Sequence, residues 1–112
     1  MVLNSLKSVK GAKELDSKLF SLPRLQILSA LYLLGGEYAF YRDLKAGLEL
    51  NDGILFFNLQ ALERMSYIGK REEEFQGKKM DAYCITLEGI DAFKKTISWV
   101  KDFSKENAEG IK

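Results

Sequence analysis

The sequence predicts a mainly helical α+β domain that contains a small antiparallel sheet. Leucines recur at helical spacing in several stretches, and two extended stretches flank the segment FQGKK at residues 75–79. The chain has 112 residues, of which 46% are hydrophobic and 29% are charged, and this composition suits one globular domain with a modest core. Together these observations favour a small domain built from helices and one hairpin.

The first twenty residues predict a helical extension. Leucines at positions 15, 19 and 22 stand at i, i+4 and i+7, which predicts a short helix over residues 12–20. The first ten residues mix leucines with lysines, and we expect them to be disordered. The short helix has two candidate positions, against the body of the domain or against a second subunit.

A longer helix is predicted after Ser21. This residue is a suitable N-cap, and Pro23 suits the first turn of a helix. The pair Gly35-Gly36 ends the helix. Residues 37–40 are aromatic and extended in character, so a short strand is expected there.

Two helices joined by the tight connection LELND follow this strand. The first is predicted over Tyr41 to Leu48. The second occupies the stretch Asn51 to Tyr67, where an Asn-Asp pair can cap the first amides and leucines 55, 59 and 62 form one apolar stripe. This is the arrangement of a helix-turn-helix, whose second helix can enter the major groove of DNA. Glu49 stands in the turn, where a glycine would take a left-handed conformation more easily.

A β-hairpin and a final helix complete the chain. Strands are predicted over Ile68 to Glu74 and Met80 to Thr86, with a glycine and two lysines at the tip between them. Thr86 is expected to cap a last helix over Leu87 to about Lys105. The order helix, strand, helix, helix, strand, strand, helix is that of the winged helix-turn-helix. The predicted parts are an N-terminal helical extension (1–20), a winged helix-turn-helix domain (21–86), a dimerisation helix (87–106) and a flexible tail (107–112).

Three segments also carry a resemblance to a known family. They are NDGILFFNLQALERMSYI from residue 51, EFQGKKMDAYCIT from residue 74 and TLEGIDAF from residue 86. They resemble the corresponding parts of small archaeal and bacterial winged-helix transcriptional regulators related to the MarR and ArsR groups, and the resemblance covers roughly residues 22–100. It implies a homodimer that binds a pseudo-palindromic operator, with the recognition helix in the major groove and the wing on the backbone or in the minor groove.

The outward face of the helix after Asn51 is the expected DNA-reading surface. With Leu55 facing the core, a step of about 100° per residue points four residues most directly outward: Gly53, Phe57, Gln60 and Arg64. Ile54 and Ala61 lie beside this face, and Asn58 lies at the flank. The net charge of +1 provides no general attraction to DNA, so phosphate contacts depend on local basic residues. The candidate DNA-binding residues are Arg42, Lys45, Asn51, Gly53, Ile54, Phe57, Asn58, Ala61, Arg64, Gln76, Lys78 and Lys79.

Several of these features have a simpler interpretation. Phe56 and Phe57 can instead belong to the core, and Lys78 and Lys79 can be ordinary solvated turn residues. Cys84 is interpreted as a buried strand residue rather than a redox switch, because no second thiol or histidine accompanies it. For the whole chain, the alternative to DNA binding is a protein-interaction module that uses the apolar face of the helix at residues 51–65.

An enzymatic function is not expected. The chain has no histidine, one cysteine, no phosphate-binding glycine loop and no spaced set of metal ligands, so neither a metal nor another cofactor is expected. It also has no signal segment and no apolar run long enough to cross a bilayer, which favours a soluble cytoplasmic protein without a membrane partner. The expected partners are double-stranded DNA and a second copy of the chain.

The final helix predicts the dimer interface. Apolar residues cover roughly half of its circumference, which is wider than the stripe that packing on one small domain requires. Because monomeric proteins rarely expose such a surface, we expect a second subunit to cover it. Alternatively, the N-terminal helix of the same chain covers part of it. The candidate interface residues are Leu15, Leu19, Phe93, Thr96, Ile97, Trp99, Val100 and Phe103.

Overall fold

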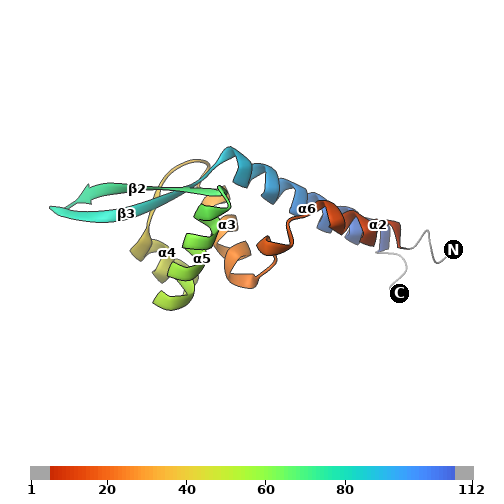
Figure 1. The fold of residues 1–112 in the computed structure, drawn as a ribbon, viewed down its shortest axis with the longest axis horizontal. Coiled ribbons are helices and arrows are strands. Elements are labelled where there is room, and N and C mark those ends of the chain that lie inside the picture. The colour runs from red at the N-terminus through yellow and green to blue at the C-terminus, as the bar shows by residue number, and fades with distance from the viewer. Residues whose placement is uncertain (1–5, 108–112) are drawn as a thin grey trace.

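The computed structural model describes residues 6–107, apart from the side chains at positions 8, 14, 103 and 105–107 (Figure 1). The predicted contributions of Phe103 and of the tail at 108–112 therefore lie outside the described residues. None of the helices described is long and apolar enough to cross a membrane. The elements, in chain order, are α2 (Lys7–Lys10), the 3-10 turns η1 (Gly11–Glu14) and η2 (Ser17–Leu19), α3 (Leu22–Leu33), β1 (Ala39–Phe40), α4 (Tyr41–Leu48), α5 (Asp52–Arg64), β2 (Ile68–Phe75), β3 (Lys78–Ile85) and α6 (Leu87–Asn107).

These elements form a winged helix-turn-helix, which confirms the predicted fold class. Helices α3, α4 and α5 form the body, while the β2–β3 hairpin and α6 extend from it in opposite directions (Figure 1). The core lies where α3 and α5 meet the sheet. Its fully buried side chains include Ile27 and Leu31 of α3 and Leu55, Leu59 and Leu62 of α5.

The predicted helix caps are all present. The Ser21 hydroxyl accepts a hydrogen bond from the Arg24 amide at 3.3 Å, and the Asn51 side-chain oxygen accepts one from the Ile54 amide at 2.9 Å. Thr86 Oγ1 accepts from the Gly89 amide at 3.0 Å and also donates to the Ser66 carbonyl at 2.6 Å. These bonds satisfy amides that would otherwise lack partners in the first turn of each helix.

The sheet is antiparallel, in the order β1-β3-β2. Gln76 and Gly77 both have positive φ, 52° and 78°, as a two-residue type I′ hairpin turn requires. Lys78 and Lys79 are therefore strand residues, paired with Phe75 and Glu74. The prediction of a five-residue tip was wrong, because the tight turn lets both strands continue to its edges.

The N-terminal segment also differs from its prediction. Instead of one helix over residues 12–20, η1 and η2 are separated by an extended Leu15. Asp16 explains the break, since its side chain accepts a hydrogen bond from the Lys18 amide at 2.9 Å and so competes with a continuous helix. Residues 7–10, expected to be disordered, form the single turn α2, which lies alongside α6 (Figure 1).

Candidate nucleic-acid interface

Helix α5 presents an apolar outward face. Its opposite side is buried against α3 and the sheet, whereas Ile54, Phe56 and Phe57 are 41%, 50% and 58% exposed. The outward position predicted for Phe57 is confirmed, and the interpretation of both phenylalanines as core residues is wrong. Gly53, Gln60 and Arg64 are exposed as well. The helix therefore offers solvent a surface of large apolar side chains that ends in polar ones.

Two candidate base-reading residues are not on that surface. Asn58 and Ala61 are only 8% and 4% exposed, so the prediction that these flanking residues belong to the DNA-reading surface was wrong. Asn58 Oδ1 accepts a hydrogen bond from Arg24 Nε at 2.9 Å, and Asn58 Nδ2 donates to the Ile54 carbonyl at 2.8 Å. The buried stripe is wider than the leucine positions indicate, because α3 covers the flank of α5. Asn58 thus ties α5 to α3.

The first turn of α5 is tied to α4 in the same way. Lys45 Nζ lies 2.9 Å from Asp52 Oδ2, and the Tyr41 hydroxyl donates to Asp52 Oδ1 at 3.0 Å. The hydrogen bond from Lys45, followed by that from Tyr41, lowers the pKa of Asp52. Burial, followed by the bond to Asp52, raises the pKa of Tyr41. Lys45, a predicted DNA contact, therefore also links α4 to α5. Nothing in the sequence pattern had indicated the roles of Tyr41 and Arg24.

The turn between α4 and α5 has a left-handed residue at Glu49, a conformation that glycine would adopt more easily. Glu49 has φ 55° and ψ 38°, the left-handed region. A residue with a side chain pays roughly 1–2 kcal/mol for this conformation. Leu48 and Leu50 on either side are half-buried against the core, which holds the turn in place.

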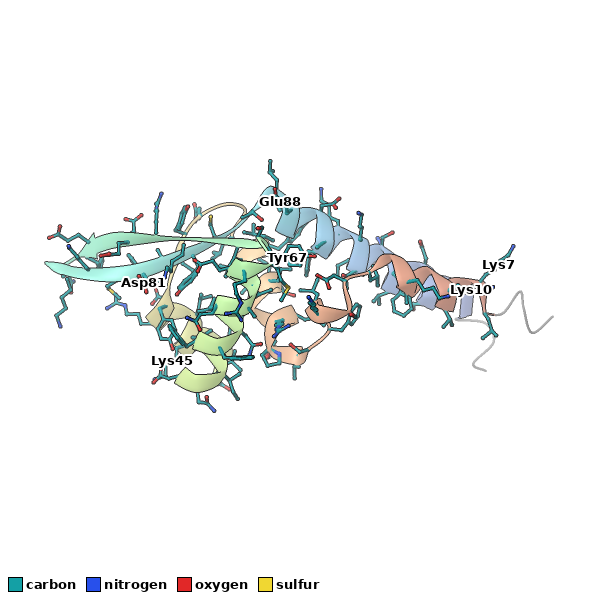
Figure 2. The ribbon with its side chains drawn as sticks, in the orientation of Figure 1. Lys7, Lys10, Lys45, Tyr67, Asp81 and Glu88 are labelled. Carbon is teal, nitrogen blue, oxygen red and sulfur yellow. The ribbon has the colours of Figure 1, made fainter. Side chains whose placement is uncertain are left out.

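The β2–β3 hairpin, which we call the wing, carries the second group of candidate residues. Gln76, Lys78 and Lys79 are exposed near its turn. In the described part of the chain neither Lys78 nor Lys79 has an ion-pair partner, although Lys79 lies directly across from Glu74. The wing and Lys45 lie at one end of the molecule, and Lys7 and Lys10 lie at the other (Figure 2).

Two cation–π contacts brace the wing. The Arg42 guanidinium lies 4.8 Å from the centre of the Phe75 ring, and that ring packs on Phe40 with centroids 5.6 Å apart. Arg71 lies 3.6 Å over the Tyr38 ring and also pairs with Glu73. Arg42 and Arg71 therefore connect α4 and the loop before β1 to the wing while their charges remain exposed.

Residues 23–104 match the winged helix DNA-binding domain family. The chain belongs to this family. The family model describes a DNA-binding domain rather than an enzyme, which confirms the expectation that the chain is not an enzyme. Within the described residues, no group of three or more acidic or cysteine side chains is placed to hold a metal ion.

Similar proteins include one curated sequence and several solved structures. An uncharacterized protein of Methanocaldococcus jannaschii is 35% identical over 85 residues, which are 76% of this chain and 90% of that protein. The winged helix domain is also similar to a PadR family transcription regulator from Clostridium difficile R20291, with a TM-score of 0.68 and 15% identity over 82% of this chain and 100% of that chain. A mutant of MepR from S. aureus, bound to an oligodeoxyribonucleotide, gives a TM-score of 0.69 and 17% identity over 96% of this chain and 80% of that chain. These structural likenesses show the fold.

Part of the predicted dimer surface is covered by contacts within one chain. Leu19 and Thr96 are buried, so they were wrong as interface residues. The Thr96 hydroxyl donates to the Ala92 carbonyl at 2.9 Å. Trp99 is half-buried, and a methyl group added at Gly11 would lie 3.2 Å from its ring. The N-terminal segment therefore covers one flank of α6, as the alternative interpretation held.

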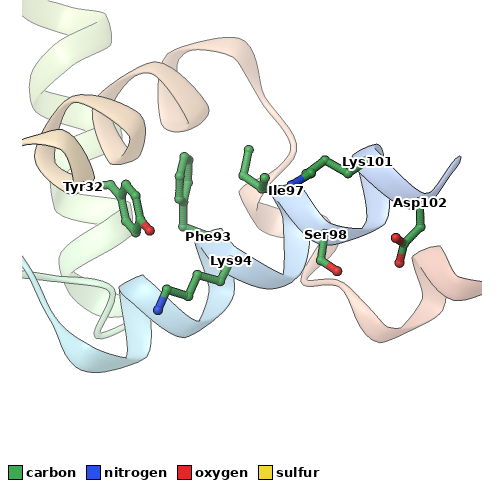
Figure 3. A pocket seen from close by; sticks show the side chains of 7 residues that line it. All are labelled: Tyr32, Phe93, Lys94, Ile97, Ser98, Lys101 and Asp102. Atoms are coloured by element: carbon green, nitrogen blue, oxygen red, sulfur yellow. The ribbon is translucent and has the colours of Figure 1, made fainter. Parts of the chain in front are cut away.

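The other flank of α6 remains open. Ile97 and Val100 are 43% and 47% exposed, and Leu15 is half-buried. Phe93 packs on Tyr32 of α3 with ring centroids 4.6 Å apart. Beside this aromatic pair lies a pocket of about 320 Å³, which Figure 3 shows along α6. Its lining residues are Tyr32, Phe93, Lys94, Ile97, Ser98, Lys101 and Asp102.

Proposed function

We propose that this chain is a sequence-specific transcriptional regulator that binds double-stranded DNA as a homodimer. In this proposal α5 enters the major groove and the wing contacts the backbone or the minor groove. The observation that carries it is the fixed and exposed position of α5. Hydrogen bonds from α3 and α4 hold the helix at Asn58 and Asp52, while its outer face is left free. Such preorganisation suits a helix that inserts as a rigid body.

The charge distribution around α5 supports the same proposal. Lys78 and Lys79 lie near the turn of the wing, Arg42 lies against Phe75 next to the same turn, and Arg64 lies at the last turn of α5. All four are exposed. These are the groups that would neutralise phosphates, which supplies most non-specific affinity for DNA. Acidic residues at positions 72, 74 and 81 reduce the net charge of the wing, so we expect moderate affinity that is sensitive to salt.

The open flank of α6 supports the proposed dimer. A second copy packed on Ile97 and Val100 would remove them from water and would cover the neighbouring pocket. A two-fold axis at this position would relate two copies of α5. Dimers of helix-turn-helix proteins set their recognition helices about 34 Å apart, one turn of DNA.

Gel-shift titration with random-sequence duplex DNA tests the proposal. At micromolar protein and low salt we expect a shifted band that weakens steeply as salt is raised, because counterion release opposes binding. Selection of preferred sites from a random pool should then return a two-fold symmetric sequence.

A second function is favoured by a specific observation, the exposure of three large apolar side chains on α5. A winged-helix module that docks on another protein through Ile54, Phe56 and Phe57 would also use them. The same titration separates the two functions, because a protein-docking module would give no shift even at low salt.

A further inference from the structure

We infer that the first two turns of α5 recognise thymine methyl groups in the major groove by van der Waals contact, rather than base edges by hydrogen bonding. This inference rests on the proposed function and deepens it, since it names the chemical feature of DNA that α5 reads. Three observations carry it: the polar side chains there are already engaged, the free ones are apolar, and the major groove offers one apolar group.

The polar side chains of the first two turns are committed within the protein. Asn51 Oδ1 accepts the capping bond from the Ile54 amide, and a paired contact of asparagine with adenine requires that oxygen. Both Asp52 oxygens accept hydrogen bonds, one from Lys45 and one from Tyr41. Asn58 uses its oxygen and its nitrogen in a buried position. None of the three can present a paired donor and acceptor to a base.

The side chains left on the surface are apolar. Ile54, Phe56 and Phe57 are the exposed side chains that follow Gly53 at the start of the helix, and Gly53 has no side chain to keep the helix from the base pairs. The next exposed polar residues are Gln60 and Arg64. At a rise of about 1.5 Å per residue, Gln60 lies about 4.5 Å and Arg64 about 10 Å further along the axis than Phe57, beyond the first two turns. In helix-turn-helix proteins the N-terminal part of the recognition helix reads the bases, so the apolar part of α5 is the part that enters.

The apolar group that the major groove presents is the C5-methyl of thymine, and phenylalanine is among the side chains that contact it. Cytosine carries only a hydrogen at C5. Ile54 and Phe57 would desolvate the donors and acceptors at the major-groove edges of cytosine, adenine and guanine without replacing their hydrogen bonds. A site with thymines under α5 therefore gains apolar burial, while other bases there lose solvation. Specificity follows from this difference.

Replacing thymine with uracil in a selected binding site tests the inference. Uracil keeps the pairing and the O4 acceptor and lacks only the methyl group. For each methyl group that α5 contacts, we expect the full-length protein to lose about fourfold in affinity, the factor for one buried carbon group. Phe57→Ala should weaken binding to the thymine site and should reduce the thymine-to-uracil ratio toward one. Lys79→Ala is the matched control, since it should weaken both sites equally.

The outcomes separate the two proposals. If the protein shifts no DNA at low salt, the proposed function fails, and the inference fails with it. If it binds the thymine and uracil sites with equal affinity, the inference is overturned and DNA binding stands. Circular dichroism of Phe57→Ala checks that the helix is intact, and because the uracil comparison changes only the DNA, it decides the matter even if this variant misfolds.

Discussion

At the scale of single residues, Gly89 shows how little space separates α6 from the end of α5. A β-carbon at this position would lie 2.1 Å from the Tyr67 carbonyl oxygen, well inside contact distance with backbone. The glycine of the TLEG segment is thus required by close packing at the start of α6. It allows the Thr86 amide to donate to the same carbonyl at 3.0 Å.

Gly89→Ala should therefore lower the free energy of unfolding by about 1–3 kcal/mol, the usual cost of forcing extra volume into a packed site. Gly47→Ala is the matched control. Gly47 lies in α4 with no atom within 4 Å of an added methyl group, so we expect that variant to be more stable by about 0.5–1 kcal/mol. Urea denaturation measures both. Equal stability changes in the two variants would contradict the role assigned to Gly89.

Tyr67 gives the fold a dependence on alkaline pH. Its hydroxyl donates to Asp16 Oδ2 at 2.8 Å, and burial, followed by this bond, raises its pKa from 10.0 to about 12. Above pH 10 the unfolded chain loses this proton first, so stability that is complete below pH 10 declines until about pH 12. Tyr67→Phe should decline less over this range in thermal unfolding. An identical decline would assign the effect to other groups, such as Tyr83, whose pKa burial also raises to about 12.

At the scale of elements, the wing is the part whose charge is most directly testable. Replacing both Lys78 and Lys79 with alanine should weaken binding to all DNA sequences alike. The slope of log affinity against log salt should fall by about 0.9 for each phosphate that the variant no longer neutralises. Lys7→Ala with Lys10→Ala removes the same charge at the opposite end of the molecule (Figure 2) and should leave the slope unchanged. Equal slopes for the two double variants would exclude the wing lysines from the interface.

The elements themselves follow closely from local sequence signals. Local signals predicted the limits of α4, the two long strands of the wing and the helix caps at Ser21, Asn51 and Thr86. Each of these features depends on side chains that are only a few residues apart in the sequence. The break in the N-terminal helix was not predicted, since one aspartate that bonds its own backbone outweighs a favourable leucine spacing. The length of the turn in the wing was not predicted either. Gln76 adopts a positive φ at the first central position of the turn, where asparagine or glycine is the usual residue.

The exposure of candidate site residues was predictable only where it depends on the geometry of α5 alone. A regular angular step placed Phe57 outward correctly. The same step could not decide whether the flanking residues Asn58 and Ala61 are exposed, and both are buried. The width of a buried stripe depends on how many neighbouring elements cover the helix, which no single stretch of sequence contains. Whether the remaining candidates contact DNA stays a prediction.

At the scale of the whole molecule, α6 decides the assembly. Sedimentation equilibrium at micromolar concentration should give twice the monomer mass of 12.8 kDa. Ile97→Glu should convert the protein to a monomer, because a charge would be buried in the interface without a partner. Leu33→Glu, at an exposed apolar position at the end of α3, is the control and should remain a dimer. A wild-type monomer would contradict the dimer. Dissociation of the Leu33→Glu variant alone would place the interface away from Ile97.

The junction at Thr86 has a geometric consequence for such a dimer. One hydroxyl bonds both the Ser66 carbonyl after α5 and the Gly89 amide at the start of α6, and so links the two helices directly. A helix of 21 residues is about 31 Å long. Over that lever arm, a tilt of roughly 10° would move its far end by about 5 Å, more than the 3.4 Å that separates neighbouring base pairs. The stiffness of this one joint would thus determine whether the two half-sites stay in phase with the double helix.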